Sequence, residues 1–213
     1  MTLQALDLAC VRGERQLFRD VSFELHSGEA LWLQGGNGSG KTSMLRLLSG
    51  LGAPQRGEVR WRGRAVRRLR EDFHRELIYF GHAGALKDDL TAWENVATSA
   101  ALAGRACDRA RACEALARVG LAAQAGLPAR ALSQGQRRRV ALAQLELPSL
   151  PPLLLLDEPF NALDQAAGDA LTATLECHLQ QGGIVVYTTH QPVRLRPSRL
   201  QQLNLESHAV ASC

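Results

Sequence analysis

The amino-acid sequence predicts an α/β fold in which strands and helices alternate around a parallel sheet. Short apolar runs of strand length, such as residues 30–34 and 182–190, are separated by segments with helical periodicity. Alternating apolar residues over 3–11 and 17–25 indicate two antiparallel strands joined by a polar turn. An alanine-rich stretch, residues 91–119, has the pattern of a helical insert. These observations predict a parallel core, an antiparallel β subdomain and a helical subdomain.

The composition is that of a soluble globular protein and narrows the function only slightly. The chain has 213 residues, of which 46% are hydrophobic and 22% charged, with a formal net charge of +4. No apolar stretch approaches the roughly 20 residues that span a bilayer, and the N-terminus lacks the pattern of a secretory signal. The five cysteines form no Cys-x-x-Cys pair, which argues against a disulfide framework or a zinc site. A cytosolic location is therefore expected.

The remaining elements follow in order along the chain. The run at residues 30–34 is nearly all apolar, so a strand buried on both faces is expected there. Further segments have the pattern of a helix at 41–51, a helix at 137–147, a strand within 151–159 and a helix at 165–180. The basic segment 60–75 is read either as a solvated surface or as a face for nucleic acid.

A glycine-rich segment, "GGNGSGKTS", connects the strand at 30–34 to the helix after it. Its spacing of Gly, four residues, then Gly-Lys-Thr is typical of a phosphate loop, whose backbone N–H groups surround a phosphate. Lys41 is expected to reach the β- and γ-phosphates and to assist catalysis, Thr42 to bind Mg²⁺, and Ser43 to be a secondary hydroxyl. A glycine-rich turn with an incidental lysine is the alternative. The predicted nucleotide-binding residues are Gly35, Gly36, Asn37, Gly38, Ser39, Gly40, Lys41, Thr42 and Ser43.

Acidic residues follow a second apolar strand. Asp157, at the end of "LLLLD", is placed to hold Mg²⁺ through water, and the adjacent Glu158 to polarise an attacking water. A helix N-cap is the alternative for this pair. His190 follows the last apolar strand, and a parallel sheet would bring it to the same edge as Asp157, although an isolated histidine is often structural.

A further motif, "LSQGQRRRVALAQ", resembles the signature of ATP-binding cassette (ABC) proteins, with Gln134 where glycine is commoner. Together with the phosphate loop, "LLLLDEP", "NALD" at 161–164 and His190, it gives five motifs in the family's order and spacing. The resemblance implies a P-loop NTPase fold, namely a single ABC nucleotide-binding domain over residues 1–213. A helical subdomain at roughly 85–140 would be inserted in its RecA-like core.

The resemblance also implies an ATPase that uses ATP and Mg²⁺ and works as a head-to-tail homodimer. In such a dimer, Ser133, Gly135 and Gln136 of one copy would bind the γ-phosphate held by the other copy. Glu158 would be the general base, and His190 would contact the γ-phosphate.

Two positions depart from the family pattern. His82 stands where most members have a metal-binding glutamine, so it is the expected metal ligand there. Arg12 stands where an aromatic side chain usually stacks on adenine, a role that a guanidinium can take.

Several stretches, including "YFGHAGALKDDLTAWENV" and "GGIVVYTTHQP", are similar to one branch of the family, the haem exporters of cytochrome c maturation. This branch implies membrane permease partners of the CcmB and CcmC type, with the chain peripheral on the cytoplasmic face of the bacterial inner membrane. Neither nucleic acid nor haem would be bound directly. There are two alternatives. One is export of another substrate, and the other is a soluble role in translation or DNA repair in which the arginines of 60–75 bind nucleic acid.

Overall fold

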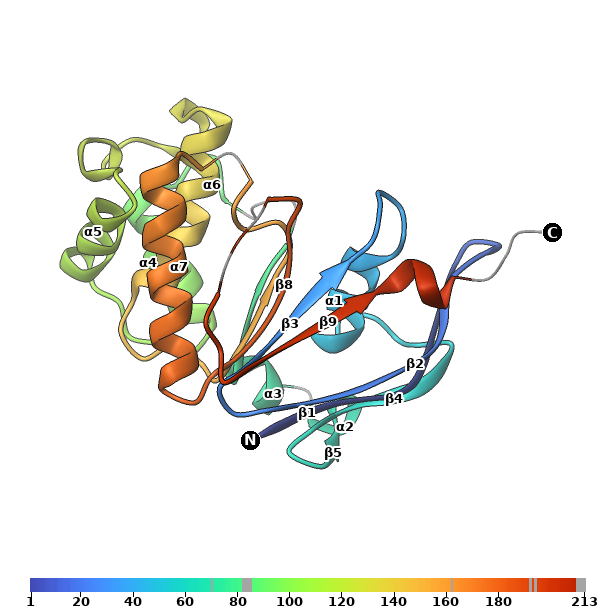
Figure 1. The fold of residues 1–213 in the computed structure, drawn as a ribbon. Helices are drawn as coiled ribbons and strands as arrows, with labels where there is room; N and C mark the ends of the chain where they lie inside the picture. The colour runs from blue at the N-terminus through green and yellow to red at the C-terminus, as the bar shows by residue number, and fades with distance from the viewer. Residues whose placement is uncertain (70, 82–85, 162, 192, 194, 210–213) are drawn as a thin grey trace. The chain divides into compact units, whose positions relative to one another are not determined.

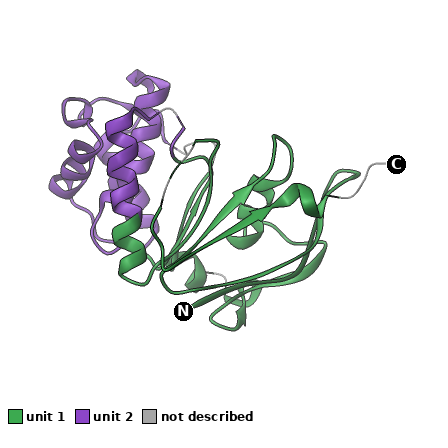
Figure 2. Ribbon diagram, in the orientation of Figure 1, with its two compact units in different colours: residues 1–81, 151–159, 176–213 green, residues 82–150, 160–175 purple. Residues whose placement is uncertain are grey.

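The computed structural model describes residues 1–69, 71–81, 86–161, 163–191, 193 and 195–209 (Figure 1). The chain divides into two compact units (Figure 2). Unit 1 comprises residues 1–81, 151–159 and 176–213, and unit 2 comprises residues 82–150 and 160–175. Each unit has its own architecture and its own buried apolar cluster.

An antiparallel sheet forms the first part of unit 1, with strand order β2-β1-β4-β5 (Figure 1). Its strands are β1 Thr2–Arg12, β2 Arg15–His26, β4 Arg56–Trp61 and β5 Arg64–Ala65. The turn between β1 and β2 contains Gly13, which has a φ of 61°. Leu3 pairs with Leu25 in the register, and both side chains are fully buried. The predicted N-terminal hairpin is therefore present and supplies one wall of the core.

A parallel sheet forms the second part of unit 1, with strand order β6-β7-β8-β3-β9. The strands are β6 Leu77–Phe80, β7 Leu153–Leu156, β8 Ile184–Thr188, β3 Glu29–Gln34 and β9 Arg199–Asn204. All residues of β7 and β8 are buried, as expected for central parallel strands. Helix α1, Lys41–Leu48, places Met44 and Leu45 in the same apolar cluster as Leu155 of the sheet.

The basic segment 60–75 forms parts of β4 and β5 and the short helices α2, Val66–Leu69, and α3, Glu71–Arg75. Arg60 pairs with Glu58, and Arg62 pairs with Glu76 and lies over the ring of Trp61. Phe73 and Trp61 are buried in the core. Much of the segment is therefore structural, with exposed arginines between its buried residues.

Unit 2 is helical. It contains α4 Ala92–Leu102, α5 Arg109–Arg118, α6 Gln134–Leu142, the 3₁₀ turns η1 Ala122–Gln124, η2 Ala129–Ala131 and η3 Ala143–Glu146, and the first part of α7 Gln165–Gln180. Alanines dominate its buried cluster, which lets the helices approach closely. The helix predicted at 137–147 instead begins at Gln134 and changes to 3₁₀ geometry at Ala143, so those predicted bounds are wrong. Pro148 follows this turn and prevents the helix from continuing.

The α/β fold with an antiparallel sheet, a parallel sheet and helices is confirmed. Helix α7 has the predicted bounds, whereas the sequence patterns did not predict β4, β5, β6 or β9. Within the described ranges, every helix is too short or too polar to cross a bilayer.

Candidate nucleotide-binding site

The phosphate loop begins where β3 ends and runs into α1. Gly40, the N-cap of α1, has a φ of 102°, a conformation that side chains with a Cβ rarely adopt. A Cβ at Gly40 would also lie 3.0 Å from the ring of Phe18. Glycine is therefore required here both by the backbone and by the close approach of β2. The loop leads directly into the N-terminus of α1, whose first N–H groups lack acceptors within the helix.

Lys41 is held against the loop. Its Nζ donates hydrogen bonds to the carbonyl oxygens of Gly35 at 2.6 Å and Gly36 at 3.2 Å. The N–H of Ser39 also donates to the carbonyl of Gly36, at 3.3 Å. The ammonium group of Lys41 thus lies beside the loop backbone that a triphosphate would approach. Phosphate oxygens could replace the two carbonyl oxygens as its hydrogen-bond acceptors.

Asp157 connects the phosphate loop to the end of β7. Asp157 is 2% exposed, and one of its carboxylate oxygens accepts a hydrogen bond from the Thr42 hydroxyl at 2.6 Å. The other oxygen accepts the hydroxyl of Thr188 at 2.9 Å. A buried carboxylate needs such donors, and these two come from α1 and from the end of β8. Three segments far apart in sequence therefore meet at one carboxylate.

Glu158 lies next to Asp157 in a strained backbone conformation, with a φ of 52°. Its N–H donates to the hydroxyl oxygen of Thr188 at 2.8 Å, so Thr188 connects both acidic residues. His190 approaches from the segment after β8: its N–H donates to Glu158 Oε2 at 3.3 Å, and its Nε2 lies 3.4 Å from Oε1. The Glu158 side chain is 12% exposed and that of His190 58% exposed. The largely buried carboxylate of Glu158 therefore lies beside the exposed imidazole of His190.

The surroundings of the site affect two other titratable groups. Burial raises the pKa of Tyr79, and the negative charge of Asp157 raises it further, while Arg46 opposes both effects. Burial also raises the pKa of the Cys10 thiol, and a hydrogen bond with the Ser43 side chain partly offsets this. Ser43 is thus engaged with the β1 strand, while Thr42 beside it is directed to Asp157.

The signature residues lie in unit 2, at the start of α6. Ser133 is the N-cap: its Oγ accepts the N–H of Gln136 at 3.3 Å, and the Gln136 Oε1 accepts the N–H of Ser133 at 2.9 Å. Ser133 is exposed. Apart from the sequence neighbours of Gly135 and the backbone of its own helix, no atom of the described residues lies within 4 Å of the position that a Cβ would take at Gly135. The chain's own packing therefore leaves this helix start open on the side of Gly135.

Among the described residues, Arg12 makes no hydrogen bond or ion pair with the phosphate loop. Arg12 ends β1, pairs in register with Arg15 across the turn and is exposed. His82 lies outside the described residues. Thr188 was not predicted, although its signal was present, because a hydroxyl at the carboxyl end of a buried strand shares an edge with Asp157.

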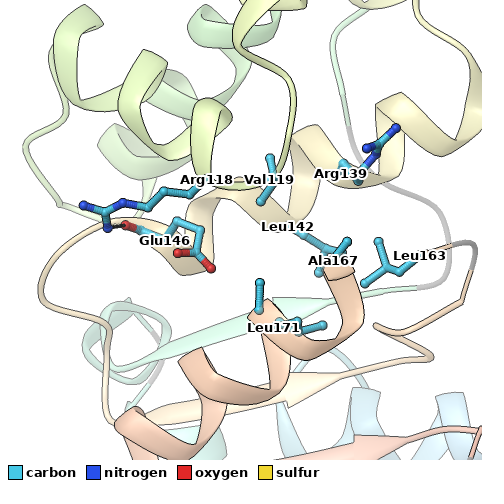
Figure 3. A pocket seen from close by; sticks show the side chains of 9 residues that line it. Arg118, Val119, Arg139, Leu142, Glu146, Leu163, Ala167 and Leu171 are labelled. Carbon is cyan, nitrogen blue, oxygen red and sulfur yellow. Dashed lines mark hydrogen bonds between the residues drawn. The ribbon is translucent and has the colours of Figure 1, made fainter. Parts of the chain in front are cut away.

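Two hollows, one in each unit, are lined by residues other than those predicted for the site. In unit 1, a hollow of about 450 Å³ lies between the C-terminal end of α1 and β4, with Leu47, Leu51, Val59, Val66 and Arg67 among its lining residues. In unit 2, a hollow of about 20 Å³ is ringed by side chains that include Val119, Leu142 and Leu171, with Arg118 and Glu146 beside it (Figure 3). Its volume is close to that of a single water. Phosphate loops bind along backbone N–H groups on a rim, so their ligand needs no deep cavity.

The donors at the phosphate loop suit Mg²⁺. The Thr42 hydroxyl and the Asp157 carboxylate are hard oxygen donors 2.6 Å apart. Mg²⁺ takes few protein ligands and completes its shell with phosphate oxygens and water, so a hydroxyl and one carboxylate beside a phosphate loop are adequate.

Comparison with known proteins gives consistent matches, over most of the chain for the family model and over nearly all of it for individual relatives. The sequence model described as "ABC transporter" matches residues 18–161. The Cytochrome c biogenesis ATP-binding export protein CcmA of Nitrosospira multiformis is 48% identical over 204 residues, which cover 96% of this chain and 98% of that protein. The CcmA protein of Escherichia coli is 44% identical over 209 residues, covering 98% and 99%.

Solved structures agree with this result. The dimeric structure of MJ0796, a bacterial ABC transporter cassette, has a TM-score of 0.81 and 27% identity, and the match covers 95% of this chain and 94% of that chain. An ATP-binding protein of a putative ABC transporter from Pyrococcus furiosus also has a TM-score of 0.81, at 21% identity, covering 99% and 100%. The second match concerns the fold alone.

Proposed function

The chain belongs to the ABC transporter family, and from this membership we propose that it is the ATPase subunit of an exporter that serves cytochrome c biogenesis. It is an ABC-type ATPase. The assignment to cytochrome c biogenesis is supported by relatives that bear this description and match nearly the full length of both chains. The single observation that carries the catalytic proposal is the chain of hydrogen bonds that runs from Thr42 through Asp157 and Thr188 to Glu158.

In the proposed mechanism, the N–H groups of the loop from Gly35 to Ser43 bind the phosphates, and Lys41 exchanges its carbonyl contacts for phosphate oxygens. Arg12 stacks on the adenine. Thr42 and Asp157, with His82 as a further candidate, would hold Mg²⁺, which would supply positive charge to offset that of the phosphates. Glu158 accepts a proton from the attacking water, and His190 contacts the γ-phosphate beside it. The products are ADP and inorganic phosphate.

A homodimer completes this site in the proposal. Ser133, Gly135 and Gln136 at the exposed start of α6 would bind the γ-phosphate held by the other copy. The open space at Gly135 and the dimeric form of the MJ0796 cassette support this arrangement. Membrane permease subunits of the CcmB and CcmC type are the proposed partners, at the cytoplasmic face of the bacterial inner membrane. Haem is the proposed cargo of the membrane subunits.

Substitution of the proposed base and of the loop lysine tests this function. We expect Glu158→Gln to lower the ATPase rate by at least about a hundredfold, because a general base contributes on the order of 10² to 10⁴ in rate. Lys41→Ala should abolish hydrolysis and also weaken nucleotide binding. Purified complex is assayed for phosphate release, and cells carrying each variant for holocytochrome c.

Glu71→Ala, which removes an exposed acid from α3, is the matched control and should retain activity. Normal holocytochrome c levels in cells whose ATPase is inactive would contradict the role in cytochrome c biogenesis while leaving the ATPase assignment intact. Full hydrolysis by Glu158→Gln would contradict the proposed base.

A further inference from the structure

The phosphate loop is held by a residue near the other end of the chain. Glu206 Oε1 accepts the N–H of Gly36 at 2.8 Å, across 170 positions in sequence. Glu206 belongs to the 3₁₀ turn η4, Leu205–His208, and lies beyond the residues matched by the family model. We propose that Glu206 is a positioning residue for ATP binding, whose carboxylate fixes the entry of the phosphate loop. This inference rests on the proposed role of the loop in binding phosphate.

The fold places this carboxylate rather than leaving it on a free tail. Strand β9 pairs in parallel with β3, and Gln34 pairs with Asn204 at the last position before the loop and before η4. The Asn204 Oδ1 accepts the N–H of Glu206 at 3.0 Å, which caps the turn. Leu205 is fully buried in the core of unit 1 and anchors the turn. The two strands thus end side by side, so that Glu206 faces the first residues of the loop.

The contact and a side chain at Gly36 would compete for the same space. A Cβ there would lie 2.9 Å from Glu206 Oε1, so the carboxylate would have to turn aside. Gly36 has a negative φ, so its backbone conformation does not itself require glycine. An alanine at position 36 would therefore displace the carboxylate from its contact with the N–H.

The Gly36 residue is held from both sides while Lys41 rests on the loop. Its N–H is bound by Glu206, and its carbonyl oxygen accepts from Lys41 Nζ at 3.2 Å. An ammonium group that turns to a triphosphate gives up its carbonyl contacts. The Glu206 contact does not depend on Lys41, so it holds the loop entry in place during that exchange. Its contribution should therefore appear in nucleotide affinity.

The negative charge of Glu206 also repels the phosphate groups of a nucleotide. This repulsion would weaken nucleotide binding, whereas the contact with Gly36 would strengthen it. Two substitutions separate the effects. Glu206→Gln retains an oxygen acceptor for the Gly36 N–H and removes the charge, whereas Glu206→Ala removes both. If positioning dominates, only Glu206→Ala weakens binding. If repulsion dominates, both variants bind the nucleotide more tightly.

The experiment measures binding of the fluorescent analogue TNP-ATP with Mg²⁺ to the full-length chain, and steady-state KM and kcat for ATP in the complex. We expect Glu206→Ala to raise Kd and KM about tenfold and to leave kcat within about twofold of the wild type. A tenfold change is the size expected for the loss of one hydrogen bond to a charged group. Glu206→Gln should stay within about twofold of the wild type. Glu71→Ala serves as the control for loss of an exposed negative charge.

A double-mutant cycle adds a test of the contact itself. Gly36→Ala should raise KM in the wild-type background but much less in the Glu206→Ala background, because no carboxylate contact is then left for the methyl group to displace. If Glu206→Ala does not fold, Glu206→Asp gives the same test, since it keeps the charge but shortens the reach. Unchanged Kd in the folded alanine or aspartate variant, tighter binding by both Gln and Ala variants, or additive effects in the cycle would overturn the inference.

Lys41→Ala distinguishes this inference from the proposed function. Loss of nucleotide binding in Lys41→Ala together with no effect of Glu206→Ala would reject only the role of Glu206. No effect of either substitution would reject the phosphate loop as the nucleotide site.

Discussion

The proposed site depends on the hydroxyl group of Thr188, which contacts both acidic residues. It donates to Asp157 at 2.9 Å and accepts the N–H of Glu158 at 2.8 Å. Thr188→Val keeps the shape of the side chain but leaves both buried partners without this hydroxyl. We expect the free energy of unfolding to fall by about 1–3 kcal/mol. The ATPase rate should fall roughly ten- to a hundredfold, because Glu158 loses its fixed position.

Chemical denaturation and phosphate release measure these two effects. Thr172→Val is the matched control, since the Thr172 hydroxyl donates only within its own helix, to the carbonyl of Gly168. A Thr188→Val protein with wild-type kcat would show that the backbone alone positions Glu158.

His178 links stability to pH. It is 5% exposed, and burial lowers its pKa below the ordinary value of 6.5, against a smaller opposing effect of a hydrogen bond with the Pro152 backbone. The unfolded chain therefore binds the proton more readily than the folded chain. The contribution of neutral His178 to the free energy of unfolding is fully present above about pH 6.5. It is lost as the pH falls below that value.

Urea denaturation between pH 7.5 and 5 measures this dependence. The wild type should lose stability on acidification, and His178→Gln should show a smaller loss. His26→Gln alters an exposed histidine paired with Glu24 and should behave as the wild type does. Identical pH profiles for the wild type and His178→Gln would contradict the role of burial at this position.

Single residues also show which features a sequence reveals. Lys41, Asp157 and His190 were predicted as site residues because each belongs to a short motif at a strand end. Thr188 stands at the same strand end as His190 and was overlooked, whereas Glu206 was missed because its importance depends on a partner 170 positions away. A local pattern contains no record of such a contact.

Among the secondary-structure elements, strong local patterns gave accurate predictions. The α7 segment is long and periodic, and its predicted bounds agree with the structure. β9 is an edge strand with the sequence RLQQLN and a mixed burial pattern, so its alternation is weak. β6 is also an edge strand, and its four residues are too few to show a period. Both strands depend on pairing with central strands, which a local sequence window does not reveal.

The start of α4 depends on one buried amide. Asn95 is 3% exposed; its Nδ2 donates to the carbonyls of Lys87, Leu90 and Thr91, and its Oδ1 accepts the N–H of Lys87 at 2.8 Å. Asn95→Leu should lower the free energy of unfolding by about 1–3 kcal/mol, because the Lys87 N–H loses its acceptor and the three carbonyls keep only their backbone donors.

Thermal unfolding and limited proteolysis near residues 86–91 measure the effect of Asn95→Leu. Thr98→Ala, an exposed change on the same helix, is the control and should alter stability by less than about 0.5 kcal/mol. Wild-type stability and protection of this segment in Asn95→Leu would show that the Asn95 hydrogen bonds are replaced by water at little cost.

Each chain holds one phosphate loop in unit 1 and one signature helix in unit 2, so the proposed site requires two copies. Glu158→Gln should bind ATP without hydrolysing it and should therefore accumulate as a closed dimer. Light scattering after size-exclusion chromatography should give twice the chain mass of 23.1 kDa with ATP and Mg²⁺, and the single mass with ADP. In the proposed dimer the γ-phosphate would contact both copies, so ATP should favour the dimer, whereas ADP lacks this contact.

The double variant Lys41→Ala, Glu158→Gln separates nucleotide binding from the acidic substitution. It should remain monomeric with ATP, because the loop no longer retains the triphosphate that joins the copies. Ser133→Arg in the Glu158→Gln background should also remain monomeric, since a bulky side chain would occupy the exposed start of α6 while the phosphate loop stays intact. ATP binding without dimer formation by Glu158→Gln itself would contradict the shared site, because one copy would then be sufficient to hold the nucleotide.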